Sequence, residues 1–173
     1  VENTIVYDLS CQKLVTIKHY YISVDKRNRV ELLRKFSNIP DFRCLVFFNS
    51  LSDLGATEER LQFNGASAVS LASDINVKFR KVILEKFKNH EISLLLGTDL
   101  LARGIDIENL EVVINFDIPR DREAYTHRAG RTGRMGNEGS VISLVTHPED
   151  LKKLKKFAKV SELVLKNQEL HEK

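Results

Sequence analysis

The sequence predicts an α/β fold: a mostly parallel β-sheet with helices on both faces, formed by a single domain. Three observations support this prediction. Short apolar runs alternate along the chain with amphipathic stretches of helical period, which is typical of parallel strands joined by crossover helices. The apolar runs are rich in Val, Ile and Leu with little polar alternation, as expected for strands buried on both faces. A length of 173 residues, 42% of them hydrophobic, suits one domain with a substantial core.

The first half of the chain is expected to alternate three strands with three helices. The strands are predicted at residues 20–24, 44–49 and 66–71. The helices are predicted through Val30, Leu33 and Phe36, from about 53 to 63, and from about 76 to 89, where apolar residues recur at helical spacing. In the third helix, the side chains expected to face the core are Phe79, Val82, Ile83 and Phe87.

The second half is expected to continue with strands at 92–96, 112–116 and 140–145, and with a short helix at 121–125. Near its end, lysines cluster at 152–156. Leu151, Leu154 and Phe157 keep helical spacing around this cluster, so the lysines most simply coat the exposed face of an amphipathic helix.

Composition sets the broad class of the protein. The net charge of +3 does not by itself indicate a nucleic-acid binder. No apolar run approaches the ~20 residues that a membrane span needs, and the N-terminus lacks the layout of a signal peptide. Two cysteines are too few for a disulfide framework, and Cys44, which opens an apolar run, is expected to be a buried thiol. We therefore expect a cytoplasmic protein without membrane contact, and a monomer, because nothing suggests an obligate dimer.

The most informative segment is 127–134, which places three arginines and two glycines on one short loop after the predicted helix at 121–125. The planar guanidinium fork suits the spread charge of a transferring phosphoryl group. The glycines permit close backbone approach and positive φ values at Gly130 and Gly133. Arginine-rich loops are also commonly solvated, so this segment alone leaves an ordinary surface loop open.

Two stretches together resemble the fifth and sixth motifs of DEAD-box RNA helicases, in that order and at that separation: Thr98-Asp99-x-x-Ala102-Arg103-Gly104-x-Asp106 and His127-Arg128-x-Gly130-Arg131-Thr132-Gly133-Arg134. A third stretch, Leu45-Val46-Phe47-Phe48-Asn49-Ser50, is similar to the fourth motif. The resemblance runs from about Ile22 to Phe157. It implies the second, C-terminal RecA-like domain of such a helicase, with residues 1–17 as an interdomain linker or peripheral segment, 18–160 as the domain, and 161–173 as a tail that frays or continues as helix.

For nucleotide binding, the resemblance implies that Arg131 and Arg134 are arginine fingers. They would reach across the cleft between the two lobes toward the terminal phosphate of ATP. Asp106 would accept a hydrogen bond from the ribose, with Gly104 keeping the approach open. Helix capping is the alternative role of Asp106.

The resemblance further implies that His127, Arg128 and Arg103 couple the two lobes. For Arg128, a salt bridge within the domain fits the pattern equally well. Asp99 is expected to order its turn, because a carboxylate facing nucleic-acid phosphates would repel them.

RNA is implied as a partner through contacts to the sugar-phosphate backbone. Thr98 and Arg80 match RNA contacts of the family, as does the stretch that includes Asp74, and Asn49 and Ser50 could present backbone amides to the same strand. The chain departs from the family beside Arg80. Ala72, Ser73 and Val77 replace the usual His and Gly before the helix and Gln three residues before the arginine. RNA contact around Arg80 is therefore expected to be weaker than usual.

The sequence contains neither a Gly-x-x-x-x-Gly-Lys-[Ser/Thr] phosphate loop nor an Asp-Glu-Ala-Asp run. The resemblance assigns both to an absent N-terminal lobe, which would hold ATP and Mg²⁺ and would be this domain's partner within the same protein. The 173 residues alone are then expected to hydrolyse ATP negligibly. Two alternatives remain: a lobe of a DEAH-type or DNA-translocating motor, whose sixth motif typically begins with Gln, and a non-catalytic RecA-like interaction module.

Overall fold

The computed structural model describes residues 3–8, 13–71, 76–105, 107–133 and 138–173. The strands are β1 (Asn3–Asp8), β2 (Lys13–Ser23), β3 (Cys44–Phe48), β4 (Ala68–Ser70), β5 (Leu94–Thr98), β6 (Val112–Asn115), β7 (Gly139–Val145), β8 (Ser161–Lys166) and β9 (Glu169–Glu172). The α-helices are α1 (Arg29–Ser37), α2 (Leu51–Phe63), α3 (Val77–Lys88), α4 (Asp99–Ala102), α5 (Arg122–Ala129) and α6 (Pro148–Lys155), and a 3₁₀ turn at Lys26–Asn28 precedes α1.

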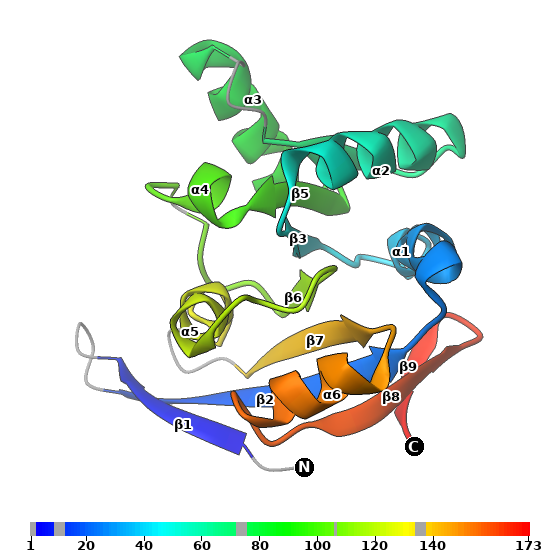
Figure 1. The fold of residues 1–173 in the computed structure, drawn as a ribbon. Coiled ribbons are helices and arrows are strands. Elements are labelled where there is room, and N and C mark those ends of the chain that lie inside the picture. Colours follow the sequence, from blue (N-terminus) through cyan, green and yellow to red (C-terminus); the bar gives the residue numbers. More distant parts are fainter. Residues whose placement is uncertain (1–2, 9–12, 72–75, 106, 134–137) are drawn as a thin grey trace.

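Within the described residues the strands form one sheet of nine, in the order β4-β5-β3-β6-β7-β2-β8-β9, with β1 also paired to β2 (Figure 1). All pairs from β4 to β8 along this order are parallel. Only β1 and β9 run antiparallel to their neighbours. The predicted mostly parallel α/β sheet is therefore confirmed.

Side chains of β7 show how both faces of the sheet are covered. Val141 and Val145 pack in a cluster with Tyr125 of α5 and Leu154 of α6. Ile142, one position along, belongs to the larger cluster on the opposite face. This alternation means that α5 and α6 cover one face, as predicted for helices on both sides of the sheet.

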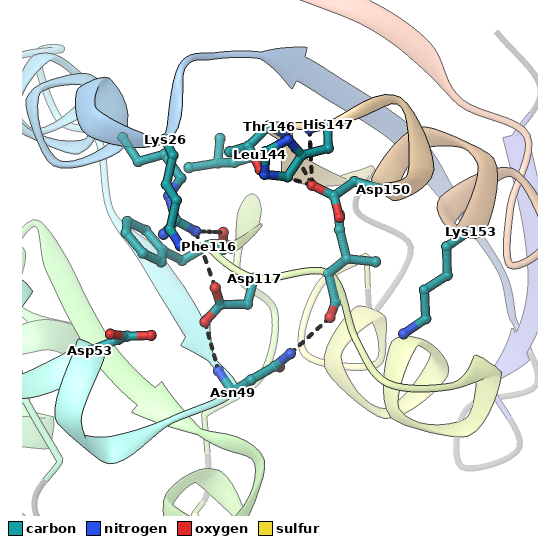
Figure 2. A pocket seen from close by; sticks show the side chains of 12 residues that line it. Lys26, Asn49, Asp53, Phe116, Asp117, Leu144, Thr146, His147, Asp150 and Lys153 are labelled. Atoms are coloured by element: carbon teal, nitrogen blue, oxygen red, sulfur yellow. Dashed lines mark hydrogen bonds and ion pairs between the residues drawn. The ribbon is translucent and has the colours of Figure 1, made fainter.

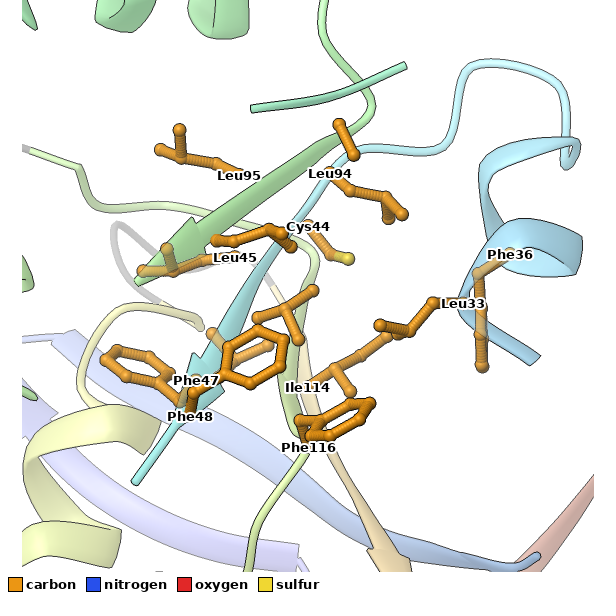
Figure 3. Packing of buried hydrophobic residues seen from close by; sticks show 14 of the residues in the cluster. Leu33, Phe36, Cys44, Leu45, Phe47, Phe48, Leu94, Leu95, Ile114 and Phe116 are labelled. Carbon is orange, nitrogen blue, oxygen red and sulfur yellow. The ribbon is translucent and has the colours of Figure 1, made fainter. Parts of the chain in front are cut away.

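The larger cluster centres on the middle strands β3, β5 and β6. Figure 3 shows Leu33 and Phe36 of α1 beside Ile114 of β6 and the residues of β3. Every residue of β3 is buried, because neighbouring strands flank it and side chains pack on both faces. The Cys44 thiol is fully buried, as predicted, and burial raises its pKa.

The prediction for α3 is wrong in part. Phe87 is buried and Ile83 is partly buried against the core, but Phe79 and Val82 are 64% and 47% exposed. Helical spacing identifies the apolar residues of a helix, but it does not show whether another element covers them. In Figure 1, α3 stands away from the sheet, and only its C-terminal end meets the core.

The prediction for residues 161–173 is also wrong. They form the β8–β9 hairpin, closed by Asn167 and Gln168 at φ 51° and 63°. A two-residue turn with both φ values positive matches the twist of a hairpin. Leu163 of β8 is buried in the main core, and β8 extends the sheet by pairing with β2. At the other end of the domain, β2 begins at Lys13, so this strand crosses the boundary that was set between residues 17 and 18.

Two further features bear on the site. Helix α5 continues to Ala129, so His127 and Arg128 belong to a helix rather than to the loop in which they were placed. Helix α6 bears its lysines on the exposed side with Leu154 buried, as predicted for the cluster at 152–156. No helix among the described residues is long and apolar enough to cross a membrane.

Candidate functional site

The carboxyl ends of β3, β5 and β6 lie side by side and bring polar residues from distant parts of the sequence together. Asn49 follows β3, Asp99 follows β5, and Asp117 comes two residues after β6. In open α/β sheets, ligands bind beyond this edge. The candidate site is therefore built around these strand ends.

Arg128 of α5 ties the three strand ends together. Its Nε and Nη2 donate to the two carboxylate oxygens of Asp99, each at 2.8 Å. Nη2 also donates to Oδ1 of Asn49 at 2.6 Å, and Nη1 donates to Oδ1 of Asn115 and to the Asp117 carbonyl at 3.2 and 3.0 Å. The guanidinium is 1% exposed, and its five N–H groups match these five acceptors. Arg128 thus forms the salt bridge within the domain, and no donor is left for a direct contact with a second lobe.

Asn49 and Asp117 form a second part of this network, shown in Figure 2. The backbone N–H of Asn49 donates to Oδ2 of Asp117 at 2.9 Å, and its Nδ2 donates to the Ile118 carbonyl at 2.9 Å. Asp117 also accepts from Nη1 of Arg29 at 3.1 Å. In this structure a carboxylate therefore accepts from the backbone N–H that Asn49 was predicted to present to RNA, and the RNA contact of Asn49 stays a prediction. Ser50 caps α2, where its hydroxyl accepts from the Asp53 N–H at 3.1 Å; its predicted RNA contact through the backbone amide stays a prediction.

The turn after β5 brings two of the predicted RNA-binding residues together. Thr98 is 8% exposed, and its hydroxyl accepts from the Leu101 N–H at 3.2 Å, which caps the short helix α4. The Leu101 carbonyl accepts from Nη2 of Arg80 at 2.7 Å. Arg80 of α3 is thereby held against the segment that Thr98 caps. The Nε of Arg80 is buried without a hydrogen-bond partner.

Arg131 lies just beyond α5 and anchors the segment that follows α4. Its Nη2 donates to the Ala102 carbonyl at 2.7 Å, and Nη1 donates to the carbonyls of Ile105 and Ile107 at 2.7 and 3.4 Å. Gly104, within this segment, has a φ of 75°, and a Cβ there would meet nothing within 4 Å. The fifth and sixth motifs are therefore in direct contact through Arg131.

The glycines of the sixth motif differ in conformation. Gly133 has a φ of 68°, as predicted. Gly130 has a φ of −63°, so the expected positive value is wrong there, because Gly130 simply ends α5 in a right-handed conformation. Asp74, Asp106 and Arg134, the other predicted site residues, lie outside the described residues.

A pocket of about 390 Å³ opens beside this contact between motifs. It brings Arg103, His127 and Arg131 together with the edge of the Arg128–Asp99 pair. The remaining lining residues are Phe47, Ala102, Asp121, Glu123 and Ala124. Four residues that the sequence assigned to nucleotide contact or to coupling between lobes thus line one cavity: Arg103, His127, Arg128 and Arg131. Among the described residues, no three His, Cys, Asp or Glu side chains gather as they would around a metal ion.

Sequence reasoning missed three structural contributors: Asn115, Asp117 and Gly139. Asn115 and Asp117 could have been found, because polar residues at the end of an apolar run mark the carboxyl edge of a parallel sheet. Gly139 packs so closely on the sixth motif that a Cβ there would collide with Thr132 Oγ1 and with the backbone N and Cα of Gly133. Because Gly139 is a single glycine outside any motif, the sequence does not reveal this close contact.

The comparisons with known proteins agree with this architecture. Residues 28–136 match the helicase conserved C-terminal domain. The chain is 43% identical over 143 residues to the probable ATP-dependent RNA helicase YfmL of Bacillus subtilis, covering 83% of this chain and 38% of that protein. It is 35% identical over 170 residues to the DEAD-box ATP-dependent RNA helicase CshC of Bacillus cereus, covering 98% and 43%. The chain thus spans about two fifths of the length of these curated relatives.

Solved structures show the same fold. A DEAD box protein from Methanococcus jannaschii superimposes with a TM-score of 0.72 at 32% identity, covering 86% of this chain and 42% of that chain. The Escherichia coli DEAD-box protein SrmB, bound to regulator of ribonuclease activity A, gives 0.71 at 27%, covering 87% and 92%. The chain belongs to the family of the helicase conserved C-terminal domain, in the RecA-like form that DEAD-box RNA helicases contain.

Proposed function

We propose that this domain is the second lobe of an ATP-dependent RNA helicase that unwinds short RNA duplexes locally. In this proposal the lobe supplies the arginine fingers Arg131 and Arg134 and part of the RNA-binding surface. The observation that supports it best is the pocket in which Arg103, His127 and Arg131 meet. The guanidinium groups of Arg103 and Arg131 suit the phosphates of a ligand that enters from outside the domain, and the carboxylates of Asp121 and Glu123 line the same cavity beside them.

The hydrogen bonds of Arg131 suggest how a finger would act. Its guanidinium donates to neutral carbonyl oxygens of Ala102 and Ile105. A phosphate oxygen carries negative charge, so its hydrogen bonds with the guanidinium gain an ion-pair attraction and a bidentate geometry that a neutral carbonyl does not offer. Exchange of a carbonyl acceptor for the terminal phosphate would therefore be favoured once an N-terminal lobe brings ATP to this pocket. Negative charge on the transferring phosphoryl group would then be stabilised where it develops.

The N-terminal lobe would hold ATP through its phosphate loop and would also hold Mg²⁺, which neutralises phosphate charge. Asp106 and Gly104 would meet the ribose. RNA would lie along Thr98 and Arg80, held by its backbone. Because the catalytic groups are divided between two lobes, this domain alone would hydrolyse ATP negligibly, and we expect the complete protein to act as a cytoplasmic monomer.

Arg131→Ala in the complete protein tests this proposal. We expect RNA-stimulated ATP hydrolysis to fall on the order of a thousandfold. The exposed Lys152→Ala on α6 serves as the control and should keep full activity. Because Arg131 also anchors the segment after α4, thermal unfolding of both variants must be compared, and Arg131→Lys must be included. Lysine keeps the charge without the planar fork, so it should restore little activity. Near-normal turnover of folded Arg131→Ala would contradict the arginine-finger role.

A further inference from the structure

The outward side of α3 exposes large apolar side chains. Phe79 and Val82 are 64% and 47% exposed, and Val77 in the first turn is 83% exposed. Phe79, Val82 and Lys86 occupy positions i, i+3 and i+7, so they share one side of the helix. Phe79 and Val82 are thus neighbouring exposed apolar side chains, the kind of patch that marks a binding surface, and nothing among the described residues covers the Phe79 ring.

The charge of α3 indicates what kind of molecule this side would bind. The helix contains five basic residues and one acidic residue, Glu85; the basic residues are Lys78, Arg80, Lys81, Lys86 and Lys88. An exposed aromatic ring flanked by cations is the combination with which proteins bind single-stranded nucleic acid, since the cations attract the backbone and the ring stacks on a base. The charge therefore favours a nucleic-acid strand over an apolar protein surface.

The location of Phe79 fits the same occupant. The next residue, Arg80, donates to the Leu101 carbonyl at 2.7 Å, and Thr98 caps the same short helix through the Leu101 N–H. The Arg80 side chain thus joins the first turns of α3 to the short helix α4. A strand whose backbone follows Arg80 and Thr98 would have bases within reach of the Phe79 ring.

We infer that Phe79 stacks on a nucleobase of the bound RNA, with Val82 extending the apolar surface under that base. This inference rests on the proposed function and deepens it, because binding by this lobe would then include a base contact as well as contacts to the backbone. The ring would offset the side-chain hydrogen bond lost where Val77 stands in place of the family's Gln. Stacking on a single ring tolerates any base, so the contact would add affinity without sequence preference.

The test measures the dissociation constant of the complete protein for single-stranded RNA, with a non-hydrolysable ATP analogue present. Phe79→Ala should weaken binding about tenfold, and Phe79→Trp should keep or improve it. Phe63→Ala is the matched control, because Phe63 is 90% exposed at the far end of α2 and should not change binding. A set of oligonucleotides, each lacking one base, then locates the contact. At one position, removal of the base should make wild type and Phe79→Ala bind equally.

The outcomes separate the two proposals. If wild type binds RNA and Phe79→Ala binds equally well, base stacking is refuted while the proposed function stands. If Phe79→Ala loses affinity to the same degree on every oligonucleotide, including all abasic ones, the side chain does not contact a base and the inference also fails. A wild-type protein that bound no RNA would overturn the proposed function itself, and this inference with it.

Discussion

Arg128 and Asp99 form a bidentate ion pair in which Nε and Nη2 lie 2.8 Å from the two carboxylate oxygens. The pair joins α5 to the end of β5, and the same guanidinium reaches Asn49 and Asn115 at the ends of the two neighbouring strands. A side chain that belongs to the sixth motif therefore contributes mainly to the integrity of the lobe. Loss of this side chain should therefore lower the stability of the domain, apart from any effect on ATP hydrolysis.

Arg128→Ala should lower the free energy of unfolding of the 173-residue chain by about 3 kcal/mol or more. The reason is that the buried acceptor of Asn115, the half-buried acceptor of Asn49 and the partly exposed Asp99 carboxylate would lose their donor. Chemical denaturation gives the number. Arg120→Ala, at an exposed arginine, is the control and should change stability by less than about 0.5 kcal/mol. An equally small loss for Arg128→Ala would show that the network contributes little to folding.

Gly139→Ala should disturb the sixth motif from outside it. The added Cβ would lie 2.7 Å from the Gly133 Cα and closer still to the Gly133 nitrogen, and backbone atoms cannot yield as a flexible side chain can. We expect a loss of about 1–3 kcal/mol in stability and a drop in RNA-stimulated ATP hydrolysis by the complete protein. Gly55→Ala offers the contrast, since a Cβ there meets nothing within 4 Å inside α2 and should stabilise the helix by about 1 kcal/mol. Unchanged activity and stability of Gly139→Ala would refute this account.

The stability of the domain should fall in mild acid because of His19. Its ring is 3% exposed, Nδ1 lies 2.7 Å from the Tyr125 hydroxyl, and burial lowers the pKa from 6.5 to about 4. Between these values the unfolded chain binds a proton that the folded domain does not. The free energy of unfolding should therefore decrease as pH falls from about 6.5 to 4, by at most about 3 kcal/mol.

Denaturation midpoints at pH 7.5 and pH 5 measure this effect. His19→Gln should flatten the dependence, because glutamine does not titrate. Tyr125→Phe keeps the imidazole buried and should therefore keep the dependence, at some cost in overall stability. If wild type and His19→Gln lose equal stability in acid, other groups are responsible for the slope.

Gln168→Gly should raise the thermal midpoint of the domain. Gln168 closes the β8–β9 hairpin at φ 63°, a left-handed conformation that glycine adopts without the steric cost that Cβ imposes. A gain of about 1 kcal/mol is expected. Gln168→Val, with a branched Cβ, should lower the midpoint instead. The same midpoint for both variants would mean that the turn is not strained.

The parts of the fold that the sequence predicts well are those in which one physical requirement dominates. Strands β3 and β5 are buried on both faces, which requires apolar residues along most of their length, and the runs at 44–48 and 94–96 show this directly. Helix α6 was predicted for a similar reason, because Leu154 and its lysines separate cleanly into a buried and an exposed side. These patterns lie within a single strand or helix, so they can be recognised without knowing which other element packs against it.

The errors arise where the decisive contact is remote in sequence. The strand β8 depends on pairing with Tyr20 and Tyr21, more than a hundred residues earlier, and the local polarity of 161–173 conceals this. Phe79 has the spacing of a core residue, but none of the elements that the structure describes lies over it. In the site, motif spacing identified Arg128, yet its acceptors Asn115 and Asp117 come from the end of β6 and the turn after it, which belong to none of the motifs.

The anchoring of Arg131 on the carbonyls of Ala102, Ile105 and Ile107 bears on the energetics of ligand capture. A free arginine side chain samples many rotamers, and immobilising it costs about 2 kcal/mol of conformational entropy. Here the chain incurs that cost when it folds. An anion arriving in the pocket would meet a guanidinium whose orientation is already restricted, so more of the new interaction would remain as net affinity, which is the benefit of preorganisation.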